Sequence, residues 1–229
     1  MTGSEGPWWP AFATVAVLLA YEGWLFLAQR HRPGQWARSA HARLREAWFA
    51  AVSAQPGSEI LAVQTLRNSL MSATMTASTA ALGLMGTVTL AVPSLHEAFA
   101  SAVRFTPRLV LELVLLSLLF ASLVSSVMAV RYYNHVGFIG GMPVGSPARR
   151  QWHATGLDYV RKAGLLYSIG LRHLILVAPV VAAILYPAAG PVAALLVVAV
   201  LLRMDRVTVG DPEERAGHHV GQGPGTDAG

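Results

Sequence analysis

Arg67 and Asn68 are the residues whose chemistry stands out first, because they interrupt a long apolar segment. They lie within residues 63–86, which read VQTLRNSLMSATMTASTAALGLMG and are long and apolar enough to cross a bilayer. A guanidinium inside hydrocarbon costs at least ~2.5 kcal/mol unless a partner or water solvates it. We therefore expect Arg67 to face the interior of a helix bundle, where another polar group neutralises it.

Polar residues occur at comparable depths in other apolar segments. Glu22 lies about 9 Å inside the first of them. Asn134, followed by His135, lies near the end of the third, and Arg172 begins the fourth. The sequence predicts a contact, direct or through water, between Glu22 and Arg67. It also predicts that five residues converge on the cytoplasmic half of the bundle: Glu22, Arg67, Asn134, His135 and Arg172. The candidate binding residues are Glu22, Arg67, Asn68, Asn134 and Arg172.

Two interpretations of this convergence remain open. In the first, the two arginines line a polar cavity for an anionic group, since the guanidinium fork matches carboxylate and phosphate geometry. In the second, the residues form a purely structural network: Glu22 neutralises Arg67, and the two asparagines bond each other. No role is assigned to His135.

The composition is that of a membrane protein. Apolar residues make up 54% of the chain, charged residues 13%, and the mean hydropathy is +0.47. The absence of cysteine excludes disulfides and thiolate chemistry. Every basic residue except Lys162 is an arginine, and most lie between apolar segments, as in cytoplasmic loops. We therefore expect the bilayer as partner, and no nucleic acid.

Five apolar segments must position the polar residues. We predict an all-α transmembrane bundle over residues 1–208, with spans at about 9–28, 59–91, 108–131, 171–186 and 190–203. The last two spans are short, and one long helix broken at Pro187 would leave four spans. Residues 209–229, rich in glycine and charge, are expected to be disordered.

Charge in the connecting segments predicts the orientation. Arginines are concentrated in the segments after the first and third spans, whereas the segment between the second and third spans holds only Arg104. The rule that cytoplasmic loops are basic then places the N-terminus outside and the C-terminus in the cytoplasm of the inner or plasma membrane.

An additional amphipathic helix is predicted over residues 35–54, on the cytoplasmic side. Its apolar face is expected to hold Trp36, Ala40, Leu44, Trp48, Ala51 and Val52, and its polar face Arg38, His41 and Arg45. Such a helix either lies in the membrane interface or packs on the bundle.

Small residues recur every fourth position in the second span, as Ala73, Ala77 and Ala81 and as Ser72, Thr76 and Ala80. This spacing favours close helix packing, with a solvated pore face as the alternative.

Two further pairs of residues have simple interpretations. Glu112 is expected to pair with Arg108, four positions earlier, although a transport-linked carboxylate is an alternative. His218 and His219 have no third metal ligand nearby. Because the sequence contains no catalytic motif and no metal-binding pattern, we expect neither an enzyme nor a cofactor.

Three blocks of the sequence resemble a known family. They are Ala62–Asn68 with Met71 and Thr74, the run Arg131–Val136, and Gly170–Arg172 leading through Pro187 and Pro191 to Met204–Asp205. In order and spacing the chain is similar to the polytopic membrane family of bacteria and plants called domain of unknown function 599. The resemblance implies an integral membrane protein and no particular activity.

The residues favour a small, oligomeric bundle with a cytoplasmic-side cavity for a small anion or polar solute. The alternative is a non-catalytic accessory subunit that assembles with itself or with another membrane protein. A solvated cavity joining Arg67 and Arg172 would favour the first, and a dry, fully paired cluster the second.

Overall fold

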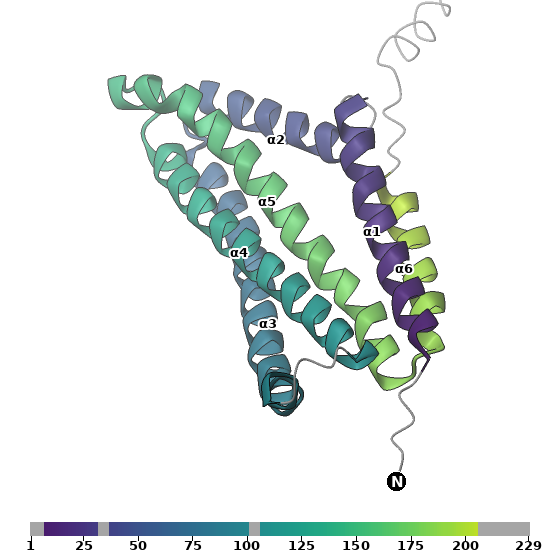
Figure 1. Ribbon diagram of the computed structural model, residues 1–229. Helices are drawn as coiled ribbons and strands as arrows, with labels where there is room; N and C mark the ends of the chain where they lie inside the picture. The colour runs from purple at the N-terminus through teal and green to yellow at the C-terminus, as the bar shows by residue number, and fades with distance from the viewer. Residues whose placement is uncertain (1–6, 32–36, 101–105, 206–229) are drawn as a thin grey trace, which may run out of the picture.

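The computed structural model describes residues 7–31, 37–100 and 106–205, and these form helices and short connections without a strand (Figure 1). The all-α prediction is confirmed. The helices are α1 (Trp8–His31), α2 (Ala37–Ala54), α3 (Glu59–Ala100), α4 (Pro107–Gly141), α5 (Pro147–Leu185) and α6 (Ala189–Asp205). The tail at 209–229, with His218 and His219, and the first two residues of the predicted 35–54 helix lie outside the described residues.

Five of the helices run alternately in opposite directions. In Figure 1, α1, α4 and α6 ascend, α3 and α5 descend, and α2 crosses the upper end of the bundle. α6 turns back after Pro187 and packs along α5 and α1. α5 and α6 are therefore two separate helices that run in opposite directions, and not one long helix broken at Pro187. The first and last helical residues lie at opposite ends of the bundle.

Four of these helices are long and apolar enough to cross a membrane: Trp8–Ala28, Glu59–Pro93, Pro107–Gly141 and Pro147–Leu185. They identify the chain as a membrane protein. α6 has 17 residues and is therefore about 26 Å long, slightly shorter than the ~30 Å hydrocarbon core of a bilayer.

α5 begins much earlier than the predicted span at 171–186. Ser146 caps its first turn by accepting a hydrogen bond from the Arg149 amide, and the helix continues through Pro179. The charged residues in the first half of α5 led to the prediction that this part of the sequence is a polar connecting segment. Arg161 and Lys162 lie on an exposed face of the helix, whereas Val160 and Ala163 are buried.

α2 packs on the bundle, mainly against α5, with a different face from the one predicted. The buried residues are Ala42, Phe49 and Val52, while Leu44 is exposed. The aromatic ring of Phe49 decides this orientation, because it fits against Gly156 of α5. A Cβ atom there would lie 2.7 Å from the ring, too close for any side chain.

Two clusters of buried residues form the core, and both are built on α4 and α5. The first joins α1 and α6 to this pair, around Tyr21, Leu119 and Leu176. The second joins α2 and α3 to it, around Phe49 and Val136. α4 and α5 themselves approach closely at Gly170, whose carbonyl accepts a 2.7 Å hydrogen bond from Ser122. This central pair keeps α1 and α3 on separate sides of the bundle.

Candidate functional site

Arg172 lies in a buried cluster made by three helices. Its Nη2 forms a 2.8 Å ion pair with Oδ1 of Asp205, the last residue of α6. The hydroxyl of Tyr21 on α1 donates a 3.1 Å hydrogen bond to Oδ2 of the same carboxylate. The guanidinium also lies 5.6 Å from the centre of the Tyr21 ring. We call these three residues the Arg172 cluster; its charges are neutralised within the chain.

Glu22 is next to this cluster in sequence and does not pair with Arg67. No ion pair within residues 7–31, 37–100 and 106–205 joins the two side chains, and α1 packs against α4, α5 and α6. The predicted direct contact is therefore wrong. α4 and α5 lie between α1 and α3 and keep the two side chains apart. Oε1 of Glu22 is buried and has no hydrogen-bond partner among the described residues.

Arg67 is exposed on α3, contrary to the expectation that it faces the bundle interior. The preceding residue, Leu66, takes the packing position against α4, so Arg67 points about 100° away around the helix. No ion pair in the described part of the chain includes it. Asn68, one position further on, is exposed as well.

Arg67 and Asn134 line one cavity of about 330 Å³ between α3 and α4. We call it the Arg67 cavity. Its other lining residues are Val63, Leu66, Leu70, Tyr133, Gly137 and Phe138. The five predicted site residues therefore do not converge. The structure places Arg67 and Asn134 together, keeps Arg172 in a separate buried cluster, and leaves Asn68 outside the lining of the cavity.

A family model described as "Protein of unknown function, DUF599" matches residues 11–209. The protein belongs to the DUF599 family. The match spans nearly all the described helices and includes both the Arg67 cavity and the Arg172 cluster. No curated protein and no solved structure matches the chain.

Sequence reasoning missed Asp205, the carboxylate partner of Arg172 in this DUF599 chain. The sequence did contain a signal for Asp205, because Met204–Asp205 ends the third block that resembles the family. The separation of 33 positions from Arg172 hid the pair, because only the reversal of the chain between α5 and α6 brings the residues together.

Arg149 is a second buried arginine besides Arg172, and its role is structural. It is buried, and its Nη1 donates hydrogen bonds to the carbonyls of Gly140 and Met142 at the end of α4. Its Nη2 donates to Ser53 of α2. The last carbonyls of a helix have no partner within the helix, so Arg149 caps α4 and fastens three helices together.

The small-residue stripe of α3 packs against α4 as predicted. Ala73, Thr76, Ala77 and Ala80 are buried, and a Cβ atom added at Gly83 would lie 3.0 Å from Leu119 of α4. Ser72 lies outside this contact and is exposed. These buried residues therefore do not line a solvated pore.

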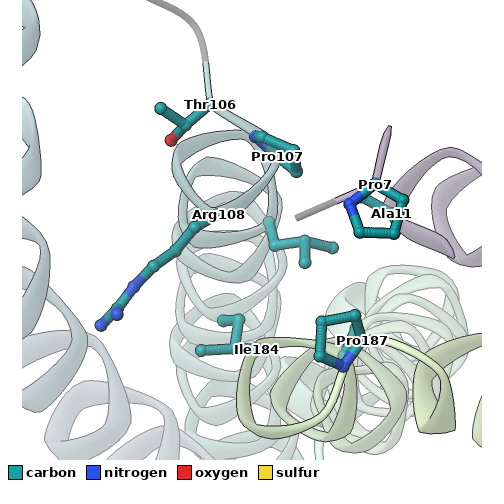
Figure 2. Close-up of a pocket in the computed structure, with 9 residues that line it drawn as sticks. Pro7, Ala11, Thr106, Pro107, Arg108, Ile184 and Pro187 are labelled. Atoms are coloured by element: carbon teal, nitrogen blue, oxygen red, sulfur yellow. The ribbon is translucent and has the colours of Figure 1, made fainter. Parts of the chain in front are cut away.

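The opposite end of the bundle contains a second cavity, of about 340 Å³. Figure 2 shows Pro7, Pro107, Ile184 and Pro187 gathered around it, with the Arg108 side chain directed away from Pro7 and Pro187. Arg108 instead forms the predicted pair with Glu112, at 2.9 Å. The cavity is therefore mainly apolar and less suited to an anion than the Arg67 cavity.

Proposed function

We propose that this protein binds an anionic group in the Arg67 cavity, at the cytoplasmic side of the inner or plasma membrane. The observation that carries the proposal is a guanidinium without a carboxylate partner in the described part of the chain, lining a cavity together with a carboxamide. Arg67 supplies a planar fork of donors, and Asn134 adds an amide donor. The volume suits a small ligand or one group of a larger one.

The basic residues support the cytoplasmic assignment. α2 crosses one end of the bundle (Figure 1) and carries Arg43 and Arg45. The first part of α5, against which α2 packs, carries Arg149, Arg150, Arg161 and Lys162. Because cytoplasmic segments of membrane proteins are basic, we place this end in the cytoplasm. α1, α3, α4, α5 and α6 are then five crossings, with the N-terminus outside and the C-terminus inside.

We propose that the protein binds this anionic group, and we do not propose that it transports the group through the bundle. Among the described cavities none joins Arg67 to Arg172, and Arg172 is occupied by Asp205. A continuous polar path across the chain would need such a junction. We propose no catalytic role and no cofactor.

Binding is tested with inorganic phosphate and the purified protein in neutral detergent. Phosphate that binds only the folded state raises the unfolding temperature. We expect this rise in the wild type and in Arg203→Ala, which removes an exposed arginine at the same end of the bundle, on α6. Arg67→Ala should abolish it. An equal rise in Arg67→Ala would refute the assignment of the site.

A second candidate function, self-assembly, is favoured by the outer face of α3. Five exposed residues follow one another at alternating spacings of three and four, as in the seam of a coiled coil: Ser72, Met75, Thr79, Leu82 and Gly86. The hydroxyls of Ser72 and Thr79 bond carbonyls of their own helix, so the small residues present no unsatisfied donor to a partner helix.

Cross-linking tests this second candidate cleanly, because the chain has no cysteine of its own. We expect Thr79→Cys to form disulfide dimers on oxidation in the membrane. Leu196→Cys, an equally lipid-accessible position on α6, serves as the matched control. Equal cross-linking of the two variants would remove the argument for the α3 seam.

A further inference from the structure

The length of the apolar run in α4 sets the level of the Arg67 cavity relative to the bilayer. Between Arg108 and Arg131, residues 109–130 contain only one charged residue, Glu112. These 22 positions span about 33 Å, which matches the hydrocarbon core. Arg131 is therefore at the edge of the hydrocarbon, and Asn134, three residues further on, lies at the level of the lipid headgroups.

α3 places Arg67, on the other side of the cavity, at the same level as Asn134. It is 42 residues long, far more than the core requires, and Arg67 lies eight residues after its start at Glu59. Because Arg67 shares the cavity with Asn134, its guanidinium is also at the headgroup level. An exposed arginine at that level is not inside hydrocarbon, which explains how it remains without a carboxylate partner.

The cavity opens towards the lipid and away from the centre of the bundle. Arg67, Asn134 and Phe138 are all exposed, although they lie on two helices that pack together. On the membrane side of the site, Met71 of α3 is 55% exposed and Val127 of α4 is 49% exposed. α2 and α5 pack against the other face of the α3–α4 pair, through Phe49 and Val160. A charged site with apolar edges therefore borders the bilayer.

We infer that the Arg67 cavity holds the phosphate of an anionic membrane lipid. Two N–H groups of Arg67 donate hydrogen bonds to two phosphate oxygens, and the Asn134 amide donates to a third. The acyl chains lie along the exposed apolar residues of α3 and α4. This inference rests on the proposed function, since the same cavity must first bind an anion. Free phosphate has the same chemistry but no acyl chains, so the exposed apolar residues on the membrane side of the site, such as Met71 and Val127, contribute nothing to its binding.

The experiment compares the protein in nanodiscs that contain phosphatidylcholine alone with nanodiscs that also contain phosphatidylglycerol. Native mass spectrometry after partial delipidation counts the retained phosphatidylglycerol. The variants are Arg67→Ala, Arg67→Gln, Asn134→Ala and the control Arg203→Ala. The two Arg67 variants ensure that a folding defect in one does not decide the result, and inorganic phosphate is added separately to the phosphatidylcholine nanodiscs.

We expect the wild type and Arg203→Ala to retain phosphatidylglycerol, and both Arg67 variants to retain about tenfold less. Asn134→Ala should show a smaller loss. Equal retention in Arg67→Ala and wild type overturns the inference. Binding of inorganic phosphate without a preference for phosphatidylglycerol also overturns it and leaves the proposed function intact. Loss of both kinds of binding from the wild type overturns both.

Discussion

Arg172 and Arg67 are the same residue type on two long apolar helices, yet they have opposite environments. Arg172 lies between α1 and α6, where the Asp205 carboxylate reaches it at 2.8 Å. Arg67 lies on α3, which packs mainly against α4, and it remains exposed beside a cavity. The difference teaches that an arginine enclosed by other helices is neutralised by the chain, whereas an arginine on the outer face of a helix is not. An arginine that the chain leaves unneutralised is available for a ligand.

The strongest test of this comparison removes the carboxylate of the Arg172 cluster. Asp205→Ala leaves a buried guanidinium unpaired, and we expect the free energy of unfolding to fall by about 3–5 kcal/mol. Denaturant unfolding in micelles, followed by circular dichroism, measures the loss. The double variant Arg172→Ala/Asp205→Ala should lose less than the sum of the two single variants. Strict additivity would show that the two residues are not coupled.

A smaller effect sharpens the description of the same cluster. Tyr21→Phe keeps the ring beside Arg172 and removes the hydrogen bond to Asp205, so we expect a loss of about 1.5 kcal/mol in the same unfolding assay. Tyr186→Phe is the matched control, since Tyr186 is exposed at the turn before α6. If both variants lose the same amount, the Tyr21 hydroxyl has no special role.

The smallest effect on stability is expected for Arg67. Arg67→Ala removes an exposed side chain without an ion pair in the described part of the chain, and the free energy of unfolding should change by less than about 0.5 kcal/mol in neutral detergent. A loss of several kcal/mol would mean that Arg67 is a structural arginine like Arg172, and the contrast between them would disappear.

Local spacing made some of this structure predictable. The pair Arg108–Glu112 follows from one turn of a helix, and the apolar runs correctly indicate an all-helical membrane protein. The buried alanines of α3 follow from the same four-residue period. In each case the information lies within one helix, so no knowledge of its neighbours is required.

The arrangement around the bundle was not predictable in the same way. Apolar runs report which segments form membrane helices but not the angle at which α1 and α3 stand about the common axis. The expected pair failed for that reason, and the α1–α5–α6 contact that joins Arg172 to Asp205 was missed. Arg161 and Lys162 misled in a related way, because they lie on an exposed face of the long helix α5 rather than in a loop.

The position of Asp205 at the end of α6 also orders events during biosynthesis. The ribosome makes Arg172 33 residues before the carboxylate that will neutralise it. The buried ion pair of α5 can therefore form only after the last residue of α6 has been made. Until then Arg172 has no carboxylate of its own cluster, so the closing of the bundle by α6 and the neutralisation of Arg172 are one event.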